Sequence, residues 1–430
     1  MFEEHPLRRD LAEEIHARPS EDLMAPAQVS HVAALVGEDG MIAHVRHIEV
    51  LCKHFRVAPP AQDAHHFITS LGDMRLKWER HTEFSTFTII RPGAADQSFK
   101  QTAIDGLPPD WLTGLPGQVV AACHVSVESD CGAERPWTDL VGLFDNNALT
   151  GSWVGDRKAR VWTDYHLHTD GFSRILIRAG DVSGQTLGRM VQRLIEIETY
   201  RMMAMLAFPI AKECRPRVTD VERQLGDIIM RLGTRDEVEN ERELLEELSA
   251  LAAETEAVNV ATSYRFAAAQ AYHEIIKRRM ASMREDRIDG IPRAMDFLDR
   301  RLAPAMESCE NLARRLEGLS GRIARATSLL RTRVDVALEA QNRDLLESMN
   351  RRARLQLRLQ ETVEGLSVVA ISYYILSLIS YLAKGAKNAG LSHFDPFVVV
   401  LVAFLPVVLG IWYGVRRVRQ KIEKTSKSQG

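Results

Sequence analysis

The densest group of histidines and carboxylates lies at residues 164–170, Asp-Tyr-His-Leu-His-Thr-Asp. In an extended strand the side chains of Asp164, His166, His168 and Asp170 would share one face. Imidazole and carboxylate groups together could gather a divalent cation, although one strand cannot wrap three adjacent ligands around an ion. Other segments would therefore have to contribute. The alternative, which we favour, is a solvated strand face that ends in an Asp-Gly turn.

A second polar row lies at residues 77–83, Lys-Trp-Glu-Arg-His-Thr-Glu. On a strand, Lys77, Glu79, His81 and Glu83 would share one face, whereas Trp78 would turn towards the core. Two carboxylates that flank a histidine could tune a proton acceptor or bind a cation. A ladder of ion pairs across neighbouring strands is the interpretation we favour. The candidate metal ligands of the two rows are Glu79, His81, Glu83, Asp164, His166 and His168, and a divalent cation is the cofactor they could hold.

The sequence lacks the motifs of the common enzyme classes. No P-loop, GxGxxG, HExxH, GxSxG or CxxC occurs, which favours a protein without covalent chemistry. A net charge of -3 provides no basic face, so we expect no nucleic-acid partner. Five scattered cysteines predict reduced thiols in a cytosolic compartment.

Both polar rows fall within residues 1–183, whose patterns predict a cytosolic α+β domain. Apolar residues from Met41 to Phe55 recur at helical spacing. Alternation predicts strands at 28–36, 74–78, 84–91, 118–127, 152–154, 160–167 and 173–178. Residues 1–180 contain 17 Lys and Arg against 25 Asp and Glu, so this domain is acidic.

Residues 184–365 predict a helical stalk domain. Glu198 and Arg201 are three residues apart, and we expect them in a polar network that joins this region to the α+β domain. A heptad seam follows at Leu312, Leu316, Leu319, Ile323, Ala326 and Leu330, and the apolar stripe then continues at a shifted phase through Val334, Leu338, Leu345 and Met349. A helix from about residue 305 into the first span would be roughly 120 Å long. Its stripe must pack on helices 185–290, on copies of itself, or on both.

Residues 366–415 predict a two-span transmembrane hairpin. The runs Leu366–Ala383 and Phe397–Val415 contain no charge, and each is long enough to cross a hydrocarbon core. In the first span Tyr373, Ser377, Ser380 and Lys384 fall on one helical face. They could line a pore in an oligomer, or they could hydrogen-bond between helices, which is the interpretation we favour.

Basic residues flank this hairpin on both sides. Residues 366–430 contain 8 Lys and Arg against 2 Asp and Glu. The positive-inside rule therefore places both ends of the hairpin in the cytoplasm and its loop outside, in the cytoplasmic (inner) membrane. The tail, residues 416–430, is predicted to lie on anionic lipid headgroups through Arg416, Arg417, Arg419 and Lys421.

Four stretches of the chain resemble a family of bacterial membrane-anchored proteins of unknown function, DUF3422. They are LAEEIHARP (11–19), LKWERHTEF (76–84), DGFSRILI (170–177) and VQRLIEIETYRMMAMLAFPIA (191–211). This resemblance implies no activity and no catalytic residue. The layout is also similar to that of CorA-type magnesium channels, pentamers with a cytosolic α/β domain, a long stalk helix and a two-span hairpin. Their Gly-Met-Asn signature is missing here, where residues 385–388 read Gly-Ala-Lys-Asn.

These patterns lead to three hypotheses for the function. The first is a membrane-anchored homo-oligomer with a cytosolic sensing or scaffolding region. The second is an ion channel or transporter of CorA-like form. The third is a membrane-tethered enzyme or regulator that depends on a metal bound by the two polar rows.

Overall fold

The computed structural model describes residues 20–36, 40–93, 98–130, 134–234, 238–388 and 395–426, together with residues 4, 5 and 8. The stretch 11–19, where the family resemblance begins, and Cys131 lie outside the described residues. The chain divides into two compact units. The first comprises Met1–Asp236 and Glu243–Ser328, and the second comprises Glu237–Arg242 and Leu329–Gly430. A mixed sheet precedes the long helices, so the predicted order of an α+β region and then long helices is confirmed.

Within the described residues, the first unit contains one nine-stranded sheet of order β2-β3-β4-β1-β5-β8-β7-β6-β9. Its strands are β1 (Ala27–Leu35), β2 (His66–Leu71), β3 (Met74–Arg80), β4 (Phe84–Pro92), β5 (Gln118–Ser129), β6 (Thr150–Val154), β7 (Ala159–Thr163), β8 (Ser173–Ala179) and β9 (Asp286–Arg287). Neighbouring strands are antiparallel except β5 and β8, which are parallel. Sequence patterns missed β2, an edge strand whose alternate residues are exposed, and the two-residue β9.

One face of the sheet is covered by α2 (Met41–Phe55), whose bounds match the sequence prediction. Its apolar stripe packs on the apolar side chains of β3 and β4, and Trp111 joins the same cluster. The largest fully buried side chains of this layer include Trp78, Phe87, Ile48 and Leu51. Shorter elements on the way to β6 are η1 (Ala103–Gly106) and α3 (Trp137–Gly142).

The opposite face is covered by α4 (Gly184–Met205). Met203 of this helix packs in one cluster with Ala33 of β1 and Ala121 of β5. Thr199 hydrogen-bonds His31 of β1, and Glu198 accepts a hydrogen bond from Ser173 of β8. The sheet is therefore buried on both sides, and side chains on its second face lie under a helix rather than in solvent.

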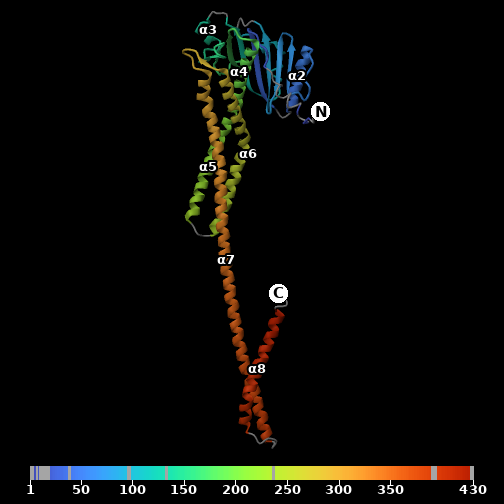
Figure 1. Ribbon diagram of the computed structural model, residues 1–430, viewed down its shortest axis with the longest axis vertical. Coiled ribbons are helices and arrows are strands. Elements are labelled where there is room, and N and C mark those ends of the chain that lie inside the picture. Colours follow the sequence, from blue (N-terminus) through green and yellow to red (C-terminus); the bar gives the residue numbers. More distant parts are fainter. Residues whose placement is uncertain are drawn as a thin grey trace. The chain divides into compact units, whose positions relative to one another are not determined.

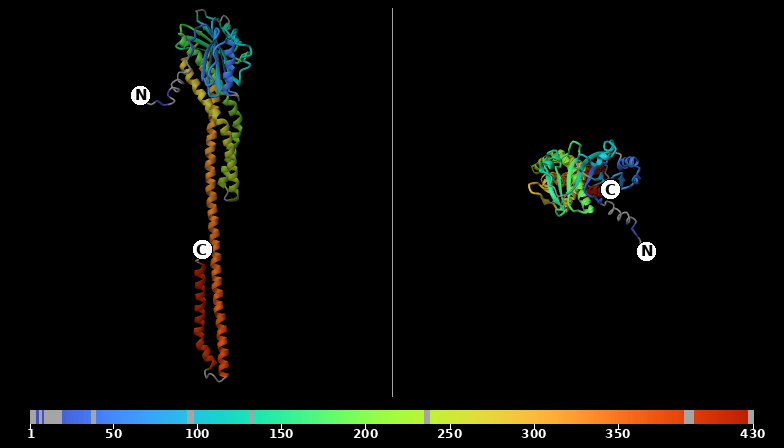
Figure 2. Two further views of the ribbon diagram at one scale, coloured as in Figure 1. Left: turned by 90° about the vertical axis from the view of Figure 1, so that its right-hand side faces the viewer. Right: turned by 90° about the horizontal axis from the view of Figure 1, so that it is seen from above.

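Beyond α4, the helices α5 (Ala207–Thr234), α6 (Val238–Met283) and the first part of α7 (Ala294–Asn388) run alongside one another (Figures 1 and 2). All six predicted seam residues from Leu312 to Leu330 are buried. Arg315 of α7 donates to Glu222 of α5 at 2.7 Å, so this part of the seam packs within one chain.

Helix α7 begins eleven residues before the predicted start at residue 305, and Pro304 lies inside it. A proline removes one helical hydrogen bond. The burial of Leu298 and Leu302 before Pro304 offsets that cost, because the helix buries an apolar face in its first turns.

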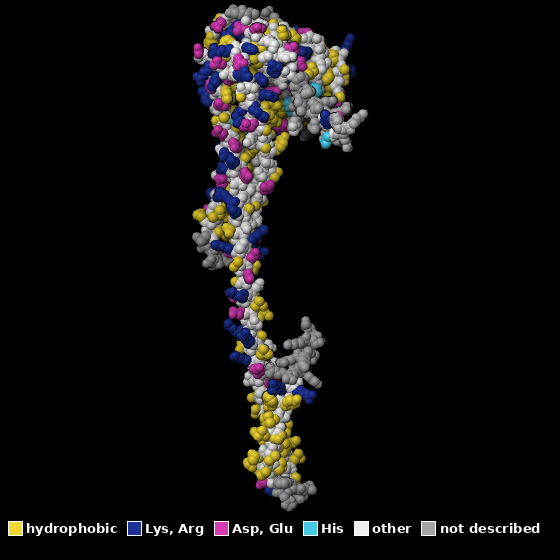
Figure 3. Space-filling view, in the orientation of Figure 1, with side chains coloured by type: hydrophobic (Ala, Val, Ile, Leu, Met, Phe, Trp, Pro, Cys, Tyr) yellow, Lys and Arg dark blue, Asp and Glu magenta, His cyan; other side chains and the backbone are white. Residues whose placement is uncertain are grey.

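The second unit contains the rest of α7 and α8 (Pro396–Ser426). Each of the two helices contains a stretch that is long and apolar enough to cross a membrane, in α8 within Pro396–Arg417. In the space-filling view, apolar side chains gather at the lower end of α7 and α8, whereas charged side chains lie along α7 above it (Figure 3). An apolar surface of this extent is unfavourable in water and is typical of helices that face lipid.

Candidate functional site

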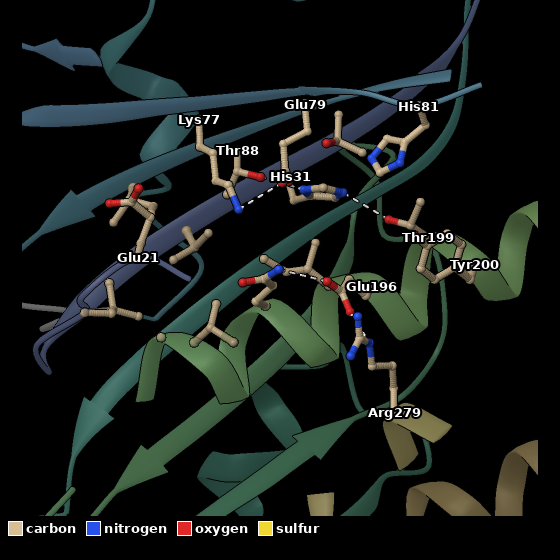
Figure 4. A pocket seen from close by; sticks show the side chains of 18 of the residues that line it. Glu21, His31, Lys77, Glu79, His81, Thr88, Glu196, Thr199, Tyr200 and Arg279 are labelled. Carbon is tan, nitrogen blue, oxygen red and sulfur yellow. Dashed lines mark hydrogen bonds and ion pairs between the residues drawn. The ribbon is translucent and has the colours of Figure 1, made fainter. Parts of the chain in front are cut away.

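A cavity of about 200 Å³ lies between the sheet and α4 in the first unit (Figure 4). Strands β1, β3 and β4 form one wall, and α4 forms the facing wall. Glu21, which precedes β1, and Arg279 of α6 also line it. The polar lining comprises Glu21, His31, Lys77, Glu79, His81, Thr86, Thr88, Gln192, Glu196, Thr199, Tyr200 and Arg279. The fold thus brings together charged groups that are far apart in the sequence.

The register of the strands explains why the sheet wall is polar. Lys77 and His31 both pair with Thr88, and Glu79 pairs with Thr86, so all five side chains share one face. The residues between them in β3 point to the opposite, apolar layer. A polar row on a face that α4 covers leaves these groups largely shielded from water.

Each wall holds one ion pair. On the sheet, Lys77 Nζ lies 3.1 Å from Glu79 Oε1, and the two side chains are only 7% and 13% exposed. On the helix wall Glu196 pairs with Arg279 of α6, and Gln192 Nε2 donates to Glu196 Oε1 at 2.9 Å. Shielded charges are costly unless they are paired, so pairing permits the burial of Lys77 and Glu79, whereas the Arg279 side chain remains 43% exposed. The cavity consequently presents both signs of charge on both walls.

His31 connects the two walls. Its Nδ1 lies 2.8 Å from Thr88 Oγ1 and its Nε2 lies 3.0 Å from Thr199 Oγ1. Burial, assisted by the neighbouring His81 and Lys77, lowers the pKa of His31 from 6.5 to about 3. The imidazole is therefore neutral at physiological pH, with one nitrogen that donates and one that accepts.

Glycine allows the chain before β1 to close one end of the cavity. Leu23 N donates to Gly184 O at 3.2 Å. A Cβ added to Gly188 would lie 1.7 Å from the backbone oxygen of Glu21, which is far shorter than any non-bonded contact. Arg75 holds the Glu21 side chain at 3.0 Å. Only glycine at position 188 permits this approach.

Beside the cavity, a buried polar network fixes α4 on the sheet. Glu198 accepts from Ser173 Oγ at 2.9 Å and from both Nε and Nη2 of Arg201, at 3.1 and 2.6 Å. The Arg201 guanidinium also lies over the Tyr165 ring, 5.2 Å from its centre. The predicted network of Glu198 and Arg201 is confirmed. The network holds α4 against the strands.

The cavity unites only part of the row predicted at residues 77–83. Glu79 and His81 line it, and the His81 ring stacks on Phe84 at 4.3 Å. Glu83 instead binds α6, where Arg265 Nη2 lies 2.6 Å from its Oε2 and the Tyr272 hydroxyl donates to its Oε1. Glu79 and Glu83 therefore lie in different surroundings, because strand β3 ends at Arg80 before Glu83 is reached.

The row at residues 164–170 does not form a strand face. Strand β7 ends at Thr163, and Tyr165 adopts a left-handed conformation with φ 56°, so the alternation is broken. His166 Nδ1 lies 2.8 Å from the carbonyl oxygen of Asp164 rather than beside His168. His168 Nε2 lies 3.0 Å from Asp164 Oδ2, and its Nδ1 lies 2.7 Å from Asp145 Oδ2. The contact with Asp145 ties the loop to the α3–β6 connection, whereas the contact with Asp164 lies within the loop.

Among the residues that the structure describes, no group of three or more histidines, cysteines and carboxylates is placed to hold a metal ion. His31, Glu196 and Arg279 were missed as site residues. The sequence contained a signal for His31, because this histidine lies within a strand, Ala27–Leu35, that consists mostly of apolar residues. No local pattern marks the other two.

The four residues of the first span that could line a pore or hydrogen-bond between helices do not share one environment in the single chain. Tyr373 and Lys384 are exposed, whereas Ser377 and Ser380 are half-buried. At the end of α8, Arg416 lies over the Trp412 ring at 5.0 Å, and both Arg416 and Arg417 are exposed. The side chains of Arg419 and Lys421 lie outside the described residues.

Comparison with known proteins gives one match. The family model described as a protein of unknown function, DUF3422, matches residues 3–422. No curated protein and no solved structure matches the chain. The match covers residues of both units.

Proposed function

The chain belongs to the DUF3422 family of proteins of unknown function, and we propose that it is a membrane-anchored sensor. Its first unit, called the head from here on, would bind a small polar ligand between the sheet and α4. The observation that carries this proposal is the cavity of about 200 Å³ with an ion pair on each wall. Concave sites with a few convergent polar groups on an apolar lining are the usual places for small ligands.

Thr86 adds a further argument for a ligand. Its side chain is buried and lines the cavity, yet within the described part of the chain its hydroxyl has no hydrogen-bond partner. A buried polar atom without a partner costs free energy, which a bound ligand or water recovers. The cavity is therefore a site that gains stability when it is filled by a polar molecule.

Thermal unfolding of the full chain in detergent tests this proposal. Amino acids, polyols, dicarboxylates and amines serve as probes at millimolar concentration, because a ligand at 100 times its Kd stabilises the folded state by about 2.7 kcal/mol. The variant Val191→Phe fills the cavity and should abolish the shift. Val221→Phe overpacks a buried site on α5 outside the cavity and should keep it. The absence of any shift in the unsubstituted chain would contradict the proposal.

For the membrane part, we propose that α8 and the apolar end of α7 span the cytoplasmic membrane with both outer ends in the cytoplasm. The support is the length and apolarity of the two stretches and the basic residues that flank them. An impermeant maleimide applied to intact cells should label Ser392→Cys, in the connecting loop, and leave Ser426→Cys unlabelled. The reverse pattern would contradict this orientation, and the unsubstituted chain reports labelling of its own cysteines.

We also propose that copies of the chain associate through the exposed stripe of α7. In the single chain Leu338, Leu345, Met349, Leu359 and Val363 are 48–71% exposed, although they continue one helical face. Chains anchored in the same membrane would present this stripe in parallel and at the same height, so the natural partner of each stripe is its own copy.

Light scattering in detergent measures the mass of the proposed assembly. Leu345→Glu with Met349→Glu should reduce the mass to that of one chain, because charges would replace the apolar centre of the stripe. Arg343→Glu changes a charge on the opposite side of the helix and should leave the mass unchanged. A single-chain mass before any substitution would contradict self-association.

A further inference from the structure

The cavity offers charges of both signs in equal number. Lys77 and Arg279 are its cations, Glu79 and Glu196 are their partners, and Glu21 is neutralised by Arg75 outside the lining. His31 contributes no charge. A ligand with a single charge would be attracted by one member of each pair and repelled by the other, which disfavours phosphates, dicarboxylates and polyamines alike.

A ligand that carries both charges, on two groups bonded to the same carbon atom, has the opposite property. Its ammonium group can approach the two glutamates while its carboxylate approaches Lys77 and Arg279, and both new contacts are charge-assisted hydrogen bonds. A neutral polyol could also hydrogen-bond these groups, but it would lack the Coulombic attraction between opposite charges that the zwitterion adds. The alternation of charge on the walls therefore matches a zwitterion.

The rest of the lining and the size of the cavity restrict this zwitterion further. Five buried aliphatic side chains line the cavity, and they are Leu23, Val29, Ile90, Val191 and Ile195. They provide an apolar surface for an aliphatic side chain. Because a cavity of about 150 Å³ holds benzene, about 200 Å³ holds about eight non-hydrogen atoms, the number in valine.

We propose that the ligand of this cavity is an aliphatic α-amino acid of about the size of valine. This inference rests on the proposed function, since it assigns a ligand class to the same site. The ammonium group lies against Glu79 and Glu196, the carboxylate against Lys77 and Arg279, and the Thr86 hydroxyl gains the hydrogen-bond partner that it lacks.

Equilibrium dialysis of the full chain in detergent compares four probes: L-valine, isovalerate, isobutylamine and the polyol erythritol. The first carries both charges, the second keeps only the carboxylate, the third keeps only the ammonium group, and the last is neutral. We expect L-valine to bind at least about tenfold more tightly than any other, because each missing charge removes a charge-assisted hydrogen bond.

Two variants test whether the lining residues bind valine. Thr86→Val should weaken valine binding about three- to tenfold without lowering the unfolding midpoint, because the hydroxyl has no partner to lose in the protein without ligand. Lys77→Met with Glu79→Leu removes a whole ion pair, so no unpaired charge remains to unfold the head, and valine binding should be lost. Lys277→Met with Glu274→Leu removes an exposed pair outside the cavity and serves as the control.

The outcomes separate this inference from the proposed function. If isovalerate, isobutylamine or erythritol binds as tightly as valine, and Val191→Phe abolishes that binding, the cavity is a ligand site and the zwitterion is wrong. If none of the four probes binds, the zwitterion is wrong. If in addition no probe of the thermal-unfolding panel shifts the unfolding midpoint, or if Val191→Phe leaves the binding unchanged, both proposals fail. Valine binding that survives the removal of Lys77 and Glu79 also overturns the inference.

Discussion

The pair of Glu198 and Arg201 should dominate the attachment of α4 to the sheet. Glu198 is 4% exposed and accepts three hydrogen bonds, two from Arg201 and one from Ser173. Burial lowers the pKa of Arg201, but the Glu198 carboxylate more than compensates, and the pKa is raised overall. The guanidinium therefore depends on this one carboxylate for its charge to be tolerated.

We expect Glu198→Gln to lower the free energy of unfolding by about 3 kcal/mol. Removal of one partner of a buried pair costs about 3–5 kcal/mol, because the other charge remains buried and uncompensated. The low end applies here, since the amide oxygen of glutamine still accepts one hydrogen bond. Glu198→Leu combined with Arg201→Met should cost less than the single substitution, because no buried charge is left.

Urea unfolding of the full chain in detergent, followed by tryptophan fluorescence, measures both effects. Five of the six tryptophans lie between residues 78 and 162, so the signal reports on the head. The matched control is Asp220→Asn, which breaks a pair of the same i,i+3 spacing on α5 whose members are largely exposed. It should leave the unfolding midpoint unchanged.

Two results would refute this reasoning. One is a loss below about 1 kcal/mol in Glu198→Gln, which would place the pair in the range of solvated surface pairs. The other is a double variant less stable than Glu198→Gln, which would mean that the pair contributes net stability rather than avoiding a penalty.

Three further outcomes are expected. Gly188→Ala should destabilise the head by about 1–3 kcal/mol and expose the chain at Glu21 to limited proteolysis, because a Cβ there meets a backbone oxygen that cannot move aside. The folded pKa of His31, about 3, lies below its unfolded value of 6.5, so its contribution is complete above pH 6.5 and is lost at about 1.4 kcal/mol per unit as the pH falls towards 3. His31→Asn should flatten the fall of the urea midpoint in this window, and an unchanged slope would contradict a neutral buried imidazole. Leu319→Ala, in the buried seam, should cost about 2–5 kcal/mol by circular dichroism, whereas an effect below 1 kcal/mol would mean that the seam is not packed in the single chain.

Hydrophobic periodicity was sufficient for most of the secondary structure. Met41–Phe55 was predicted with its observed bounds, because a helix with one buried stripe leaves a period of 3.6 in the sequence. The strand over residues 160–167 was predicted four residues too long. Polar residues at alternate positions suit a strand and a loop equally, and the left-handed backbone at Tyr165 leaves no periodic trace.

The candidate site shows a different limit. Alternation placed Lys77 and Glu79 on one face, but it could not show that α4 covers this face, nor that Glu83 binds α6 instead. Glu196 and Arg279 are separated from that strand by more than one hundred residues, and their meeting depends on how two helices pack on the sheet.

By itself, the sequence determined the apolar helices at the C-terminal end, the basic residues beside them, the family and the faces of the strands, because each is written in the local order of residue types. The tertiary structure decided which of the polar rows becomes a site. A row of charged residues in a strand forms ordinary exposed ion pairs unless another element covers it and excludes water. The close approach of α4, fixed by Glu198 and by the glycine at position 188, turns Lys77 and Glu79 into the wall of a cavity.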